Sequence, residues 1–503
     1  MRTLHRSSVR CAATANHVIL NILLSFVCFT LMFSFRRMLR YSICRRAHAI
    51  VSKRNWEQVQ PALTKAIAEA DFVSFDYELT GLHEKNDRYI GVSQSYEAHC
   101  EGVKKFIPIQ LGICAARFRD GQWTLTPASI YLYPTSSEET GACFSVSTAA
   151  LNFLGSNGFD FNDWIQNGLS WLSPAEEEER RRLVKVRIAE IDDLIKAASS
   201  AEPESNSFPK IELPQGADRE AMENLKKQIS EWLGQGAEQP LEIPMESAFL
   251  RLLAHTFVSQ EFPGLFSHST KRGDIRLLCV YKRKEDLFAE QKRSLEQELL
   301  KIDRELGARA LFDTMSASRI PIVGHNCFYD LLHTFKSFYG EVPPYVDQFK
   351  QKWLAKFPRT FDTKYIAESN DVLGGLQPPA TLKGLCEFML AGQGENPLTV
   401  SIDAIGPEFS YHLPAGTGHS DLSHDAGYDA MMTSLVFLLQ LRHILERRSL
   451  RFDQVDFRLS NGKAGLSDGP PRIPVHELLR TAVNRIRLVK TQPPSLNLRE
   501  REP

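Results

Sequence analysis

The chain lacks paired cysteines, because its nine cysteines are scattered and no C-x-x-C pair occurs among them. This scatter argues against a zinc ribbon and against a disulfide scaffold, and a reducing compartment is the simpler interpretation. An excess of charge of either sign is also missing, since 60 lysines and arginines stand against 61 aspartates and glutamates. Binding of a strongly charged partner therefore requires a local groove rather than a uniformly charged surface. No internal repeat is found.

Acidic residues are missing before Glu57, whereas arginines are frequent there. Residues 18–35 form an apolar run at the short limit for a membrane span, with arginines on both sides. Three interpretations stay open. The run is a membrane anchor that leaves the rest of the chain in the cytosol, or part of a mitochondrial targeting segment. Alternatively translation starts later, for example at Met38, which allows a nuclear or cytoplasmic protein. We favour the anchor.

Length and composition predict a globular chain of two or more domains, because the 503 residues are 43% hydrophobic and 24% charged. Apolar alternation predicts strands, and apolar residues at helical spacing predict helices. Strands are expected at 72–76, 106–114, 123–133, 275–281 and 321–323. Helices are expected at 56–70, 148–195, 218–234, 246–260, 284–306 and 475–489.

A stretch rich in Ser, Pro and Glu at 198–216 indicates a linker. A small α/β domain is therefore expected to interrupt a larger α/β domain. The predicted order is an N-terminal extension (1–48), the first part of the larger domain (50–195), a linker (196–217), the inserted domain (218–283), a connecting helix (284–306), the second part of the larger domain (307–447) and a C-terminal tail (448–503).

Two carboxylates share one predicted strand. Residues 72–78 are largely apolar and carry Asp76 and Glu78 with one residue between them. Because alternate side chains of a strand point to the same face, both carboxylates project together. Repulsion and desolvation make their joint burial costly without cations. Carboxylate oxygens are the ligands that Mg²⁺ and Mn²⁺ prefer, so the pair predicts a metal site.

Two further acidic positions lie at the starts of predicted helices. Asp330 follows Asn326 by four residues, so both share one helix face if the helix begins near residue 327. Asp429 opens a very apolar run and follows His424 by five residues. A histidine of ordinary pKa can accept a proton from an activated water near neutral pH. Paired divalent ions are a common device for cleaving phosphodiesters, and the joint set predicts this chemistry.

These residues resemble the DEDD exonuclease superfamily, whose four acids correspond here to Asp76, Glu78, Asp330 and Asp429. The spacing of His424 and Asp429 is similar to that of the DEDDh branch. Within this branch, the chain most resembles the poly(A)-specific ribonuclease (PARN) family. The resemblance covers about residues 50–495 and rests on residues 70–76, 158–162, 167–168, 323–326, 361–364 and 424–430.

The resemblance implies an RNase H-like DEDD exonuclease fold, with a mixed central sheet flanked by helices. It implies a 3′–5′ exoribonuclease that removes poly(A) and releases 5′-AMP, with two Mg²⁺ or Mn²⁺ ions on the four acids. In the implied roles His424 is the general base, and Lys364 and Asn326 lie near the RNA. The inserted domain resembles a nucleic-acid-binding domain named for an Arg-x3-His motif, matched by Arg251 and His255. Family members dimerise, so a homodimer is expected.

Departures from the family keep other functions open. Leu79, beside the expected 3′-end pocket, stands where the family usually has an aromatic residue. No aromatic-rich motif of an RNA-recognition domain follows residue 448, so dependence on the RNA cap is not expected. One alternative is a membrane-associated trimmer of small or non-coding RNA 3′ ends. Another is a non-catalytic RNA-binding protein, against which the presence of all five site residues argues. The site chemistry does not distinguish RNA from DNA.

Overall fold

The computed structural model describes residues 49–82, 89–134, 143–198, 217–392, 398–403, 405, 424–458 and 472–500. The apolar run 18–35, the alternative start at Met38 and most of the predicted linker lie outside these ranges. Within them, no helix combines the length and the apolar character required to cross a membrane. The chain divides into two compact units, one formed by residues 175–305 and one by the residues before and after them.

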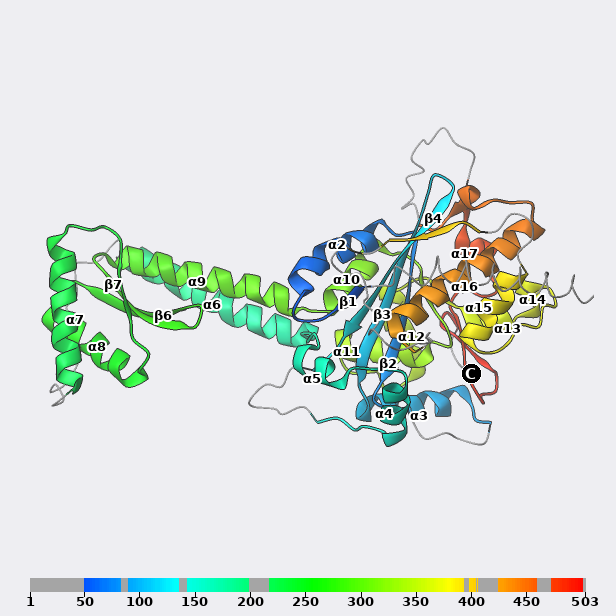
Figure 1. Ribbon diagram of the computed structural model, residues 1–503, viewed down its shortest axis with the longest axis horizontal. Coiled ribbons are helices and arrows are strands. Elements are labelled where there is room, and N and C mark those ends of the chain that lie inside the picture. Colours follow the sequence, from blue (N-terminus) through cyan, green and yellow to red (C-terminus); the bar gives the residue numbers. More distant parts are fainter. Residues whose placement is uncertain are drawn as a thin grey trace, which may run out of the picture. The chain divides into compact units, whose positions relative to one another are not determined.

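A mixed sheet of seven strands, counted over the described residues, forms the centre of the larger unit (Figure 1). In spatial order its strands are β1 (Ala49–Val51), β4 (Gln122–Tyr131), β3 (Pro108–Arg119), β2 (Phe72–Leu79), β8 (Ile322–Gly324) and β9 (Thr360–Asp362), with β10 (Val400–Ile402) paired to β4. Neighbours among β2, β3 and β4 are antiparallel, whereas β8 and β9 run parallel to β2. The predicted mixed central sheet is confirmed.

Helices cover both faces of this sheet. In chain order they are α2 (Trp56–Glu69), α3 (Val92–Lys105), α4 (Thr148–Ser156), α5 (Phe161–Asn167), α10 (Arg309–Ser318), α11 (Phe328–Tyr339), α12 (Val346–Lys356), α13 (Thr363–Glu368), α14 (Asn370–Leu373), α15 (Leu382–Ala391), α16 (Ala426–Arg447) and α17 (Val475–Leu478). A 3-10 helix (Phe452–Gln454) and the short strands β11 (Val455–Asp456), β12 (Ile473–Pro474), β13 (Arg485–Arg487) and β14 (Ser495–Asn497) follow α16.

Alternate side chains of β2 enter two different hydrophobic clusters. Val73, Phe75 and Tyr77 pack with residues of α2, α10 and α11, and Phe72 packs with residues of α16. On the α16 side, the buried Ser74 hydroxyl donates a hydrogen bond of 2.6 Å to the Ala430 carbonyl. Because strand side chains alternate, Asp76 and Glu78 belong to the α16 face. The periodicity of the sequence thus decides the side of the sheet on which the acids lie.

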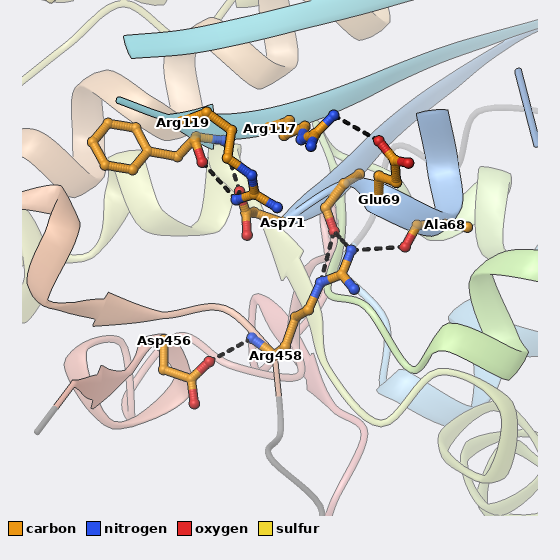
Figure 2. A network of polar contacts seen from close by, with 9 residues as sticks. Ala68, Glu69, Asp71, Arg117, Arg119, Asp456 and Arg458 are labelled. Atoms are coloured by element: carbon orange, nitrogen blue, oxygen red, sulfur yellow. Dashed lines mark hydrogen bonds and ion pairs between the residues drawn. The ribbon is translucent and has the colours of Figure 1, made fainter. Parts of the chain in front are cut away.

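The end of α2 and the start of β2 are held by a polar network (Figure 2). The Arg458 guanidinium donates to the carbonyl oxygens of Ala68 and Ala70 at 2.7 and 2.6 Å, which satisfies acceptors that the helix end leaves open. The Asp71 carboxylate accepts from the backbone N–H of Phe118 on β3 at 2.7 Å. This network fixes the point at which the chain turns from α2 into the acid-bearing strand.

The chain after residue 472, predicted to belong to a tail, is part of the core of the larger unit. Ile486, Leu488 and Leu496 are buried in the same cluster as α2 and α11. The helix predicted at 475–489 is limited to α17, because Leu479 leaves the helical conformation with a φ of -112° and a ψ of 37°. The antiparallel pair β13–β14 follows. The apolar spacing was correct, but a short hairpin buries the same side chains.

Over its described residues, the smaller unit consists of two long helices, two shorter helices and a three-stranded sheet (Figure 1). Its elements are α6 (Pro174–Ala198), α7 (Ala217–Gly234), β5 (Leu241–Pro244), α8 (Ala248–Glu261), β6 (Phe266–Arg272), β7 (Ile275–Tyr281) and α9 (Lys284–Glu305). Ion pairs such as Lys292 with Asp192, at 2.8 Å, join α9 to α6. The sequence did not predict β6, because its run of Ser, His and Thr lacks an apolar alternation.

Candidate active site

Asp76 and Glu78 lie near the end of β2, where the sheet meets the start of α16. Asp76 pairs in register with Gly112 of β3, and Glu78 pairs with Gln110. Both acids are half-buried, whereas Tyr77 between them is buried and its hydroxyl lies 3.1 Å from the Thr334 hydroxyl on α11. The predicted arrangement, with the two acids on one face and the tyrosine on the other, is therefore present.

Asp330 comes from a different part of the chain and reaches the same place. Strand β8 runs parallel to β2 and pairs Val323 with Ser74, so α11 starts beside the acid-bearing strand. Asp330 lies in the first turn of α11, is 8% exposed, and lies close enough to raise the pKa of Asp76. A parallel strand pair followed by a helix thus brings the third acid next to Asp76.

The start of α16 supplies the remaining groups, and Asp425 fixes its position. The Asp425 carboxylate accepts hydrogen bonds from the backbone N–H groups of Gly427 and Tyr428, at 3.0 and 3.2 Å, and so caps the helix. It also accepts from Gln110 Nε2 of β3, at 3.1 Å, and from the Ser129 hydroxyl of β4. One side chain therefore starts the helix and attaches it to two central strands.

Two glycines allow this close approach of α16 to the sheet. A Cβ atom at Gly112 would lie 1.8 Å from the Ala426 carbonyl oxygen, and a Cβ at Gly427 would lie 2.3 Å from the Ser129 hydroxyl oxygen. Neither position has room for a side chain. The glycines bring the first turn of α16, with Asp429, directly onto β3 and β4, and β3 pairs with β2, which carries Asp76 and Glu78.

His424, Asp429 and Glu78 meet at this point. Each offers a potential ligand atom, and the three atoms lie within 4.8 Å of one another. His424 precedes the helix with a φ of 76°, and its backbone N–H donates to Asp429 Oδ2 at 3.2 Å. The exposed His424 ring contacts the ring of Phe153 on α4, with a centroid separation of 4.5 Å. The histidine is thus held by its backbone and by an aromatic neighbour.

The electrostatics of the site require positive charge. Burial, then the carboxylates of Asp330 and Asp429, raise the pKa of Asp76 well above its ordinary value. Burial, then Asp429 and Asp425, raise the pKa of Glu78 in the same direction. Burial raises the pKa of Asp330 to about 7. Clustered carboxylates of this kind are costly to ionise without a counter-charge, and their oxygens suit hard divalent cations such as Mg²⁺ and Mn²⁺.

The predicted substrate-side residues Asn326 and Lys364 lie in two turns. The helix expected to begin near residue 327 begins at Phe328, and Asn326, with a φ of 56°, lies in the turn before it rather than on its face. Lys364 lies in the first turn of α13 and is half-buried. Burial, then the nearby Lys364 charge, lowers the pKa of His325 to about 3, so this histidine is neutral near pH 7.

Arg251 and His255 lie in the smaller unit and have contacts within it. The buried Arg251 guanidinium donates to the carbonyl oxygens of Met245 and Glu246, at 2.6 and 2.7 Å, which contradicts an RNA-facing orientation. Both ring nitrogens of His255 lie 2.8 Å from serine hydroxyls of β6. The i, i+4 spacing placed both residues on α8, but its orientation turns the arginine toward the backbone of its own unit.

The sequence did not single out four residues that shape the site: Gln110, Ser129, Phe153 and Asp425. A signal existed only for Asp425, since an aspartate directly before an apolar helix is a common N-cap. The other three contribute through tertiary contacts between segments far apart in the chain.

Comparison with known proteins agrees with this site. Residues 51–437 match the CAF1 family ribonucleases. The poly(A)-specific ribonuclease PARN of Arabidopsis thaliana is 27% identical over 453 residues, covering 78% of this chain and 63% of that protein. The poly(A)-specific ribonuclease PNLDC1 of Mus musculus is 23% identical, covering 88% of this chain and 78% of that protein. The pre-piRNA 3′-exonuclease trimmer of Bombyx mori is 25% identical, covering 63% of this chain and 58% of that protein.

The chain thus spans somewhat less than two thirds of the length of the Arabidopsis PARN relative. The family match, by contrast, includes β2, α11 and the start of α16, which carry the four acids and the histidine. By this match, the chain belongs to the CAF1 family of ribonucleases.

Proposed function

We propose that this protein is a 3′–5′ exoribonuclease that removes poly(A) from RNA 3′ ends and releases 5′-AMP. One observation carries the proposal: carboxylates from β2, α11 and α16 converge on one site beside His424. The family membership and the PARN relatives support the same activity.

In this proposal Asp76, Glu78, Asp330 and Asp429 hold two divalent cations, Mg²⁺ or Mn²⁺. Bound there, the cations would supply an acidified water nucleophile and stabilise charge on the phosphate. His424 accepts the proton of the attacking water through its imidazole ring, which is exposed at the site. Its backbone bond to Asp429 keeps the ring beside the acids. Lys364, which is near His325, neutralises a phosphate of the RNA.

The first test measures AMP release by the full chain from an A-tailed RNA with a free 3′ end, with Mg²⁺ and with EDTA. Asp76→Ala should abolish release while leaving the folded state intact by circular dichroism. Release that continues in this variant would contradict the proposed site. If the wild-type chain binds RNA but never releases AMP, the non-catalytic alternative is correct.

A trimmer of other RNA 3′ ends is the second candidate function. It is supported by the similarity to the Bombyx mori trimmer and by Leu79, which is half-buried at the end of β2 next to Glu78. Rates on A-tailed and mixed-sequence RNA of equal length separate the two functions. A marked preference for the A-tailed RNA supports deadenylation, whereas equal rates support trimming.

The localisation and the oligomeric state of the protein are further parts of the proposal. The apolar run 18–35 supports a membrane association with the catalytic unit in the cytosol, with mitochondria as the alternative. Imaging of the tagged chain with and without residues 1–48 tests this localisation. Sedimentation of the full chain tests the proposed homodimer.

A further inference from the structure

Asp362 is a fully buried carboxylate outside the acidic cluster, at the end of β9. Among the residues that the structure describes, no cationic side chain contacts it, and burial raises its pKa. A carboxylate in such a place is costly unless hydrogen bonds satisfy it. We therefore asked which contacts satisfy the buried Asp362 carboxylate and what they position.

The Asp362 carboxylate collects backbone N–H groups from three separate segments. Its Oδ1 atom accepts from Asn326 at 2.8 Å and from Lys364 and Tyr365 at 2.9 and 3.4 Å. Its Oδ2 atom accepts from Arg487 of β13 at 2.9 Å. An ordinary helix cap needs only the contacts to residues 364 and 365. The contacts to Asn326 and Arg487 go beyond that role.

The two turns that Asp362 joins are also linked by neighbouring groups. The Thr363 hydroxyl donates to the Gly324 carbonyl at 3.2 Å and lies 2.9 Å from His325 Nδ1. Gln440 of α16 donates to the Thr363 carbonyl at 2.9 Å. One turn leads into α11 and Asp330, whereas the other presents Lys364. The network thus connects the substrate-side turns to the helix that carries Asp429.

The C-terminal hairpin supports this junction from the other side of β9. The buried Asn484 side chain accepts from the Thr360 N–H at 2.8 Å and donates to the Pro358 carbonyl at 2.9 Å. The Arg487 side chain pairs with Glu368 of α13. Residues distant in sequence therefore hold the same short strand that ends in Asp362.

We propose that Asp362 is a positioning residue for the RNA 3′ end: it sets the turn of Asn326 and the backbone of Lys364 relative to each other, with the C-terminal hairpin as its support. The inference rests on the proposed function, because it assumes that RNA contacts Lys364. Asp362 itself touches neither RNA nor the reacting atoms.

The substitution Asp362→Asn tests this role with little change in shape. An amide keeps one acceptor oxygen but turns an N–H toward a backbone donor, so the junction loses at least one contact. Because Asp362 acts on binding rather than on the reacting atoms, KM for A-tailed RNA should rise about tenfold, with kcat changed by less than about threefold. Asp453→Asn makes the same chemical change at an exposed ion pair with Arg451, outside this junction, and should leave both constants unchanged.

A double-mutant cycle decides whether Asp362 acts through Lys364. Combined with Lys364→Ala, the Asp362→Asn change should add little to KM, whereas independent effects would multiply. Multiplying effects, or a lower melting temperature with an unchanged KM, would overturn the inference. RNA affinity is then measured in the inactive Asp76→Asn background, once with Asp362 and once with Asp362→Asn. Equal RNA affinity with and without Asp362→Asn overturns the positioning role, whereas absent AMP release by the wild-type chain overturns only the proposed function.

Discussion

The backbone N–H of His424 donates a hydrogen bond to Asp429 Oδ2 at 3.2 Å, so the histidine and the last of the four acids are fixed to each other. The bond spans the turn that Asp425 caps, and Asp425 is attached to β3 and β4. The five residues from His424 to Asp429 therefore span the Asp425 N-cap and the first turn of α16.

Replacing His424 should reduce turnover without unfolding the chain. His424→Ala removes the proposed proton acceptor, and kcat should fall by about 10²–10⁴-fold, with little change in KM. The side chain is exposed, so the melting temperature should stay near that of the wild type. Steady-state kinetics at pH 7 measure the effect. An unchanged kcat would show that another group accepts the proton.

The metal-free protein should become less stable as the pH rises from about 4 to 7. The pKa of Asp330 is about 7 in the folded chain and 3.8 ordinarily. Between these values the unfolded chain has released its proton while the folded chain retains it, so stability falls with rising pH. Added Mg²⁺ should raise the melting temperature most at pH 7, since it favours the ionised acids.

Thermal unfolding in EDTA over this pH range checks the effect, with Asp330→Asn as the matched variant. The variant carries no titrating group at this position, so its melting temperature should fall less over the same range. Parallel curves for the two chains would assign the pH dependence to other groups.

A methyl group at Gly112 should displace the start of α16. Gly112→Ala places a Cβ 1.8 Å from the Ala426 carbonyl oxygen, so the helix must move away from β3. We expect a loss of about 3 kcal/mol in the free energy of unfolding, together with reduced AMP release. Denaturant unfolding measures the loss. Gly234→Ala at the end of α7 is the control, because nothing lies within 4 Å of its Cβ.

Removing the Arg458 guanidinium should affect stability but not chemistry. Arg458→Ala leaves the carbonyl oxygens of Ala68 and Ala70 without this donor (Figure 2). The free energy of unfolding should fall by about 1–3 kcal/mol, because Ala70 is buried and its carbonyl oxygen loses this donor. Since β2 keeps its sheet partners, kcat should stay unchanged. A large fall in kcat would show that the network also holds Asp76 in its position at the active site.

The acids were predictable from the sequence because their signals are local. The alternation around Asp76 and Glu78 places both on one face of β2, and the apolar runs after Asp330 and Asp429 start helices. Where a local pattern was extended too far, the prediction was wrong. The hairpin after Asn484 was assigned to a helix, because apolar residues at helical spacing do not show where a helix ends.

By itself, the sequence determined which residues carry the chemistry, since residue type and spacing are properties of short segments. Only the tertiary structure decided how these segments meet. The Gly112 contact with α16, the bonds of Asp425 to Gln110 and Ser129, and the junction at Asp362 each join residues far apart in the chain. Such contacts depend on sheet order and on the close packing of backbones, which no local pattern records.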